Sequence, residues 1–235
     1  MANDKLFQKR KAATRKSLQR RAAARSERKR ALIVCEDEVS VPSYLRKLIR
    51  HLGLDTVDIE IYGKECGSAP RSVIDYGQQC LRADADFDFV YFVFDKDAHT
   101  TYTDALGKVT GLRKNKKYKA ISIEVITSVP CFELWLLLHY KNSSKPYSTE
   151  GNKSPADCLI SDLRKLDPFR YYAKNDRNCN YFDRIKDRIN TASKHAELLL
   201  QNGLNTRQNK YYINPSTLMH KLVSGLREIV DSYKS

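Results

Sequence analysis

The chain has 235 residues, of which 41% are hydrophobic and 30% are charged, a balance typical of a protein that can bury a core. No apolar run approaches the roughly 20 residues needed to cross a bilayer, and the N-terminus lacks the apolar core of a secretory signal, so we expect a cytoplasmic protein without membrane contact. Six cysteines without a C-x-x-C pair argue against a zinc site or a disulfide scaffold.

The net charge of +14 is concentrated in an N-terminal arm. Residues 1–30 hold 12 of the 42 Lys and Arg residues but only 2 of the 28 Asp and Glu residues. Good helix formers without Pro or Gly predict a helical or disordered arm over residues 1–29. Such an arm would either solubilise the chain or contact nucleic acid or an acidic partner. The candidate nucleic-acid contacts are Arg10, Lys11, Arg20, Arg21, Arg28, Lys29 and Arg30.

A strand–helix alternation follows the arm. Apolar runs predict strands at residues 30–35, 57–62, 88–94 and 120–126. Start and stop signals predict helices near residues 40–52, 70–82 and 103–114, and from about Pro130. This order favours an α/β core over residues 30–140, built on a mostly parallel four-stranded sheet with helices on both faces.

The composition changes after Tyr140. Residues 141–154 are polar and contain Pro and Gly, which predicts a long surface loop that is mobile or functional. The remaining sequence predicts helices at about 155–166, 181–201 and 215–232. We therefore expect residues 141–235 to form a mobile loop and a helical C-terminal part packed on the core.

A cationic and aromatic stretch lies within this C-terminal part. Arg170, Lys174 and Arg177 are interleaved with Tyr171 and Tyr172, a composition that nucleic-acid contacts share. An irregular loop packed by its tyrosines would have the same composition. Lys174 is the candidate nucleic-acid-binding residue here.

Acidic residues directly follow two of the predicted strands. Glu36, Asp37 and Glu38 follow the first strand, and Asp95 and Asp97 follow the third. Parallel sheets bind ligands beyond the carboxyl ends of their strands, so these carboxylates would converge if the strands are neighbours. Clustered carboxylates suit Mg²⁺ or Mn²⁺ and favour metal-dependent phosphate chemistry. The alternative is two polar loops whose acids cap the following helices.

Other polar residues lie near these acids in the sequence. Glu133, near the start of the helix after Pro130, would either stabilise the helix dipole or join the metal site. Lys96 or His99 would steady negative charge on a reacting phosphate. His99 could also act as an acid, or it could be a loop residue without a role. His139, on an apolar helix, is more typical of a satisfied core residue.

Taken together, these motifs resemble those of the RloB-like family, whose core is similar to a Toprim domain. The matching segments occur in the family's order at residues 32–38, 94–99, 130–139 and 214–217. The resemblance implies a Toprim arrangement in which Glu36 is the glutamate after the first strand and Asp95 and Asp97 are the D-x-D metal ligands. It makes Glu133 the glutamate of the F-E-L-W motif, an extra ligand or base. Asp37 stands where the family usually has Gly, so it would either strain the backbone or add a carboxylate.

The resemblance implies a Mg²⁺-dependent endonuclease that acts as a toxic effector in bacterial anti-phage defence by abortive infection. Its expected partners are nucleic acid, with RNA such as tRNA favoured over DNA, and an ABC/SMC-like ATPase encoded nearby, with a homodimer left open. The expected metal ligands are Glu36, Glu38, Asp95 and Asp97, and the expected catalytic residues are Glu36, Asp95, Asp97, Glu133, Lys96 and His99. A non-catalytic subunit that binds nucleic acid or the ATPase is one alternative, and primer synthesis or strand passage is another.

Overall fold

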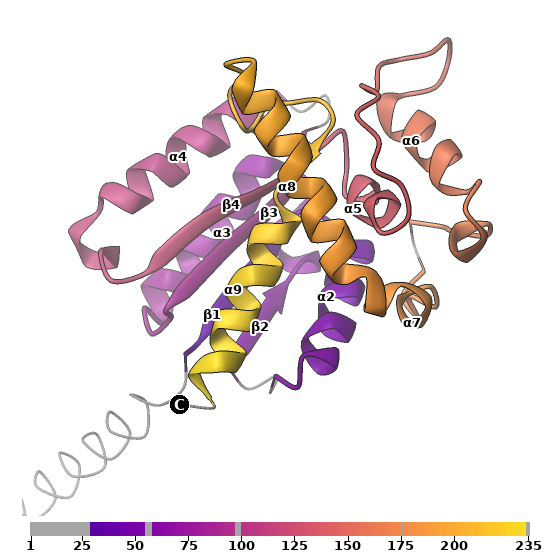
Figure 1. Cartoon of the computed structure of the whole chain (residues 1–235). Coiled ribbons are helices and arrows are strands. Elements are labelled where there is room, and N and C mark those ends of the chain that lie inside the picture. The colour runs from indigo at the N-terminus through magenta and orange to yellow at the C-terminus, as the bar shows by residue number, and fades with distance from the viewer. Residues whose placement is uncertain (1–28, 55–57, 97–99, 175, 234–235) are drawn as a thin grey trace, which may run out of the picture.

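A five-stranded, mostly parallel sheet organises the fold (Figure 1). The structure, a computed structural model, describes residues 29–54, 58–96, 100–174 and 176–233. The strands are β1 (Ala31–Cys35), β2 (Ile59–Tyr62), β3 (Phe89–Asp95), β4 (Ser122–Val129) and β5 (Ser216–Thr217). They lie in the order β2-β1-β3-β4-β5, and only β5 is antiparallel to its neighbour. The predicted α/β class and parallel sheet are confirmed.

Helices cover both faces of this sheet (Figure 1). They are α2 (Ser40–His51), α3 (Pro70–Ala83), α4 (Tyr102–Lys114), α5 (Glu133–Leu138), α6 (Pro155–Leu163), α7 (Phe182–Ile185), α8 (Ile189–Asn205) and α9 (Met219–Ser232). α3 and α4 pack on one face, and α2, α5, α8 and α9 pack on the other. None of the helices in the described part of the chain combines the length and apolarity that a bilayer crossing needs.

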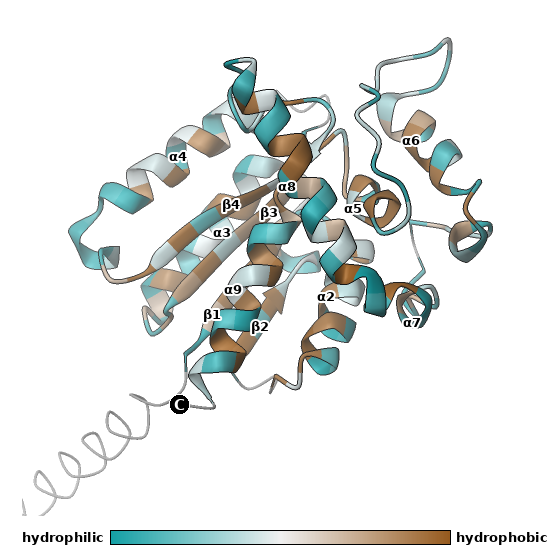
Figure 2. Cartoon of the chain, in the orientation of Figure 1, coloured by the Kyte–Doolittle hydropathy of each residue, from teal (hydrophilic) through white to brown (hydrophobic). Residues whose placement is uncertain are grey.

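The central strands are apolar throughout because both of their faces are buried. Leu32 and Phe92 belong to the cluster beneath α3 and α4, whereas Ile33 and Tyr91 belong to the cluster that includes α2, α5, α8 and α9. This alternation follows from the two-residue period of a strand. Figure 2 shows the hydrophobic residues along the strands and on the helices that face them. The polar ends of the strands are therefore the places where the sheet can carry a site.

The C-terminal part differs from the predicted elements in two places. The helix predicted from residue 215 begins at Met219, because Ser216 and Thr217 form β5 against β4. The Oγ atoms of Ser128 and Thr217 lie 2.9 Å apart across this pair. The helix predicted at 181–201 is divided into α7, a 3-10 turn at Lys186–Arg188, and α8, which continues to Asn205. A two-residue strand carries too little periodicity to be predicted.

The polar segment 141–154 is tied to the C-terminal part by Tyr147. This side chain is buried, and its backbone N–H donates to the side-chain oxygen of Asn214 at 3.1 Å. The side-chain nitrogen of Asn214 donates back to the carbonyl of Tyr147 at 2.7 Å. The segment is thus fixed at one buried point beside the sheet.

Candidate functional site

The carboxyl ends of β1, β3 and β4 meet at one cleft of about 230 Å³. Glu36 continues β1, and its backbone N–H donates to the Val93 carbonyl of β3 at 2.9 Å. The backbone N–H of Asp95 donates in turn to Oε2 of Glu36 at 3.2 Å. Glu133 enters from the first residue of α5, just after β4. Neighbouring parallel strands therefore bring Glu36, Asp95 and Glu133 to the same cleft.

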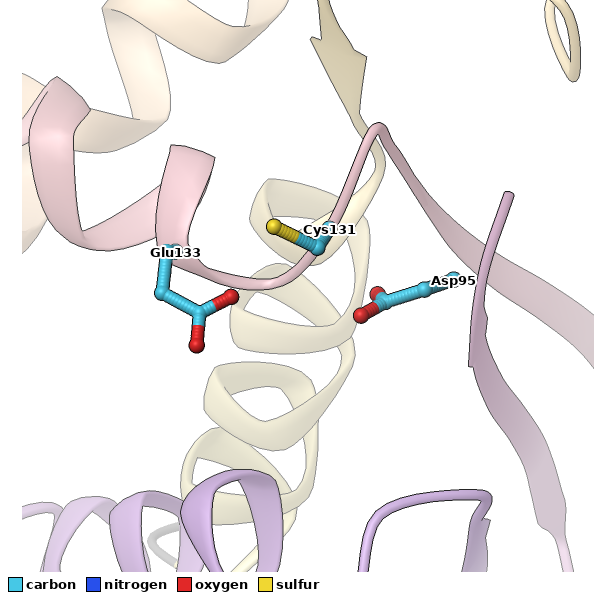
Figure 3. Close-up of side chains that lie close together, drawn as sticks. All are labelled: Asp95, Cys131 and Glu133. Atoms are coloured by element: carbon cyan, nitrogen blue, oxygen red, sulfur yellow. The ribbon is translucent and has the colours of Figure 1, made fainter. Parts of the chain in front are cut away.

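Asp95, Cys131 and Glu133 form the tightest group in this cleft (Figure 3). One ligand atom from each lies within 4.8 Å of the other two. Asp95 approaches from the end of β3, while Cys131 and Glu133 lie on either side of the start of α5 (Figure 3). Cys131 was not among the predicted site residues. Its place two residues before Glu133 was the available signal.

Negative charge is crowded in the cleft. Burial raises the pKa of Asp95 well above its usual value, and the carboxylates of Glu133 and Glu36 raise it further, against the lowering effect of Lys174. Burial also raises the pKa of the Cys131 thiol, with Glu133 and Asp95 adding to the shift. Cys131 is therefore a neutral thiol at neutral pH, which leaves the carboxyl groups as the oxygen donors of the site.

Glu133 is a buried carboxylate in which one of the two oxygens has a hydrogen-bond partner. It is 1% exposed, and its Oε1 accepts a 2.8 Å hydrogen bond from the hydroxyl of Tyr172. The ammonium of Lys174 lies 3.8 Å from the same oxygen. Its Oε2 has no hydrogen-bond partner among the described residues. A buried polar atom left in this way calls for a further partner, such as a ligand.

Tyr172 and Lys174 come from the C-terminal part, far from the sheet in sequence. The hydroxyl of Ser40, at the start of α2, donates to the carbonyl of Lys174 and fastens this segment over the cleft. Tyr172 is buried, whereas the adjacent Tyr171 is 91% exposed. Lys174, the predicted nucleic-acid contact, has its ammonium among the acids of the cleft.

The acids after β1 have different surroundings. Asp37 accepts hydrogen bonds from the backbone N–H groups of Val39 at 3.0 Å and Val41 at 2.8 Å, so both its oxygens serve the start of α2. Its φ is not positive, so Asp in place of the family's Gly causes no left-handed strain. Glu38 is exposed and lines a neighbouring pocket. The structure therefore does not bring the predicted ligand Glu38 into the cluster.

The candidates beyond Asp95 are only partly described. Asp97 and His99 lie outside the described residues. The ammonium of Lys96, a predicted catalytic residue, lies 5.3 Å from the ring centre of Tyr212, and Lys96 is not among the residues that line the cleft. His139 is buried, and its Nδ1 donates to the Trp135 carbonyl at 2.9 Å, in agreement with the core interpretation.

The basic arm lies almost wholly outside the described residues. The undescribed candidates are Arg10, Lys11, Arg20, Arg21 and Arg28. Lys29 pairs with Glu228 at 2.8 Å. Arg30 pairs with Glu60 at 2.9 Å and with Asp84 at 3.0 Å. These two cations lie at the amino ends of the strands, opposite the cleft, and are engaged in ion pairs rather than placed at the site.

Comparison with known proteins gives one family. A family model described as RloB-like protein matches residues 31–226, most of the chain. The matched span includes the cleft from Glu36 to Lys174. No curated protein gives a significant match.

Proposed function

The chain belongs to the RloB-like protein family, and from this membership and the carboxylate cleft we propose that it is a metal-dependent nuclease. The observation that carries the proposal is the meeting of Glu36, Asp95 and Glu133 beyond the ends of parallel strands. That edge is where open α/β sheets bind their ligands. The proposed cofactor is Mg²⁺ or Mn²⁺.

The donor set suits a hard divalent cation. Glu36, Asp95 and Glu133 offer carboxylate oxygens, which these ions prefer. Oε2 of Glu133, buried and without a partner among the described residues, would gain one in the water that attacks the phosphate. The raised pKa of Cys131 keeps it a thiol, which is a poor ligand for these ions. When bound, the cation would supply Lewis-acid polarisation of a phosphodiester.

The remaining chemistry falls to the side chains of the cleft. Asp95 and Glu36 would hold the cation. Glu133 would accept a proton from the attacking water at Oε2, because Oε1 already accepts from Tyr172. The ammonium of Lys174 would offset the charge on the phosphate while the water oxygen bonds to phosphorus and the leaving oxygen departs.

Cleavage of labelled RNA and DNA strands with Mg²⁺ or Mn²⁺ tests the proposal. Asp95→Asn and Glu36→Gln are expected to slow cleavage by about 100-fold or more, since each removes a charge that acts on the reacting phosphate. Glu197→Gln is the matched control, because it makes the same chemical change at an exposed glutamate of α8 that does not line the cleft. Its cleavage rate is expected to stay within about twofold of the wild type.

The biological part of the proposal rests on the family. We propose a toxic effector in anti-phage defence that cleaves RNA such as tRNA and is restrained by an ABC/SMC-like ATPase. Induced expression with and without the ATPase, followed by sequencing of RNA ends, tests this. Wild type should arrest growth and produce new ends, and Asp95→Asn should do neither. A non-catalytic binding subunit is favoured instead if neither nucleic acid is cleaved, even with the ATPase activated, and the toxicity of Asp95→Asn equals that of wild type.

A further inference from the structure

A second, strongly cationic pocket lies beside the carboxylate cleft. Its charged lining consists of five cations and two acids, Glu38 and Glu65. The cations are Arg46, Lys47, Arg50, Lys64 and Arg177. A further pocket shares Lys47 and Arg50 of α2 and is also lined by Lys186, which follows α7. We call the surface formed by the five cations the basic groove.

Most cations of the basic groove are not engaged with the protein. The side chains of Arg46, Arg50, Lys64 and Arg177 are exposed, and none forms an ion pair or hydrogen bond with the residues that the structure describes. Lys47 is the exception, since its ammonium donates to the Cys179 carbonyl at 3.1 Å. Arg30, by contrast, pairs with acids at the opposite edge of the sheet. Because these cations have no acidic partners among the described residues, the groove keeps a net positive charge.

The basic groove and the cleft are built from the same three segments. The start of α2 gives Ser40 to the cleft and Arg46 to the groove. The turn before α3 gives Ser68 to the cleft and Lys64 to the groove. The C-terminal segment gives Lys174 and Arg177 in the same order. The two pockets are thus lined by nearby residues of the same segments.

The turn that carries Lys64 is packed tightly against the segment before α2. A Cβ at Gly63 would lie 2.7 Å from the Asp37 carbonyl oxygen and 3.0 Å from Cγ of Pro42. Real Cβ atoms do not approach a backbone atom this closely, so only glycine lets the two segments meet here. This contact keeps the cations of Lys64 and α2 on a common surface.

From this geometry we propose that the basic groove binds the phosphodiester backbone of a single nucleic-acid strand and leads it to the carboxylate cleft. The inference deepens the proposed function, because it names the surface that would hold the substrate next to the reacting phosphate. Exposed Arg and Lys side chains without protein partners are suited to repeated phosphates. The acidic cleft alone would repel a polyanion, so a cationic surface beside it is needed to hold one.

Binding in EDTA tests the groove separately from catalysis. The probe is a short, fluorescein-labelled single strand of mixed sequence, as RNA and as DNA, titrated with the full chain from about 50 to 200 mM salt. The groove variant is Arg46→Gln, Arg50→Gln and Lys64→Gln together. The matched control, Lys114→Gln, Lys116→Gln and Lys119→Gln, removes the same charge from exposed lysines at the amino end of β4. The basic arm is unchanged in both.

The salt dependence gives the expected result. Each lost phosphate contact on a single strand lowers the slope of log affinity against log salt by about 0.7, so three lost contacts lower it by about 2. Over this fourfold rise in salt, the wild-type affinity should fall about 20-fold more than that of the groove variant. The control variant should keep the wild-type slope. A second variant, Arg46→Lys with Arg50→Lys, keeps the charge and should bind within about twofold of wild type.

Three results would overturn the inference. They are absence of binding by the wild type at low salt, an unchanged slope in the groove variant, and an equal loss in groove and control variants. The first would leave an acidic protein surface as the occupant to test. The binding assay contains no divalent ion, so it is independent of the cleavage assay with Mg²⁺ or Mn²⁺. A protein that binds through the groove in EDTA but does not cleave when the metal is added would contradict the proposed function alone. A groove variant that binds and cleaves normally would contradict the groove alone.

Discussion

The hydroxyl of Tyr172 donates a 2.8 Å hydrogen bond to Oε1 of Glu133, joining the C-terminal segment to the first residue of α5. Burial raises the pKa of this phenol, and the neighbouring Glu133 raises it further, so Tyr172 remains a donor at physiological pH. The bond fixes the rotamer of the buried carboxylate and leaves Oε2 to face the cleft. Tyr172 therefore positions Glu133.

Tyr172→Phe should weaken both the fold and the site. A hydrogen bond to a charged group contributes about 1.5 to 3 kcal/mol, and its removal leaves Glu133 less satisfied. We expect urea unfolding to show a loss of this size, together with slower cleavage. Tyr171→Phe is the matched control, because the neighbouring ring is 91% exposed, and it should change stability by less than about 0.5 kcal/mol. Equal effects of the two substitutions would show that the hydroxyl of Tyr172 is not special.

Asp95→Asn should stabilise the metal-free protein while abolishing cleavage. Burial and the nearby Glu133 and Glu36 raise the pKa of Asp95, so the folded state holds the Asp95 proton more tightly than the unfolded state does. The stability contribution of Asp95 is therefore full at low pH and is lost as pH rises through the folded pKa. In EDTA near neutral pH we expect Asn to add about 1 kcal/mol to the free energy of unfolding.

The pH and the metal provide the controls for this substitution. The advantage of Asn should shrink as the pH is lowered, because the wild-type carboxyl then becomes protonated as well. Saturating Mn²⁺ should raise the melting temperature of the wild type and leave Asp95→Asn almost unchanged. A variant less stable than wild type at neutral pH in EDTA would contradict the view that the Asp95 carboxyl lowers the free energy of unfolding at this pH.

The sheet and the first part of the site could be predicted because their signals are local. Strands covered on both faces are continuous apolar runs, and the acids that end them are adjacent in sequence. Once β1 and β3 are neighbours in a parallel sheet, Glu36 and Asp95 must meet at its carboxyl edge. The same logic could not separate Asp37, which caps α2, from Glu38, which faces the basic groove. That distinction depends on the conformation of the loop between β1 and α2, which is not set by a local sequence pattern.

The rest of the cleft depends on contacts between distant segments. Tyr172 and Lys174 reach Glu133 only because the chain returns across α2, where Ser40 holds the Lys174 carbonyl. Nothing in the sequence around residue 172 distinguishes the buried tyrosine from the exposed one beside it. The basic groove was missed for a similar reason, since its cations come from three segments that are distant in sequence.

His139 should make stability depend on pH. Burial lowers its pKa to about 4, although its hydrogen bond to the Trp135 carbonyl acts in the opposite direction. Between pH 6.5 and 4 the unfolded chain binds a proton that the folded chain does not, so stability falls as the pH is lowered through this window. The full loss is about 3 kcal/mol.

Urea unfolding of His139→Met at several pH values measures this contribution. The difference between variant and wild type should grow in favour of the variant as the pH falls from 6.5 to 4. Other titrating groups, including the half-buried His220, are common to both proteins and cancel. His51→Met is the control, because it makes the same substitution at an exposed histidine. Parallel curves for wild type and His139→Met would exclude a buried neutral histidine.

Lys174 should oppose metal binding and support cleavage. Partial burial lowers the pKa of Lys174, but the neighbouring acids, Glu133 first, outweigh it and the net shift is upward, so the ammonium is charged at neutral pH. It lies 3.8 Å from Glu133 and competes with any cation that enters the cleft. Its side chain is 51% exposed, and such pairs contribute at most about 1 kcal/mol. Lys174→Met should therefore tighten Mn²⁺ binding by up to about fivefold.

Lys96→Met separates this local effect from a general change in charge. Lys96 directly follows Asp95 in sequence, yet its ammonium lies over the ring of Tyr212. We expect its removal to leave Mn²⁺ affinity within about twofold of wild type, measured by titration calorimetry at low salt. Lys174→Met should bind the ion more tightly but cleave more slowly, because the phosphate loses its neighbouring ammonium. Weaker Mn²⁺ binding in Lys174→Met, or an equal change of Mn²⁺ affinity in the two variants, would mean that the ammonium of Lys174 does not compete with the cation beside Glu133.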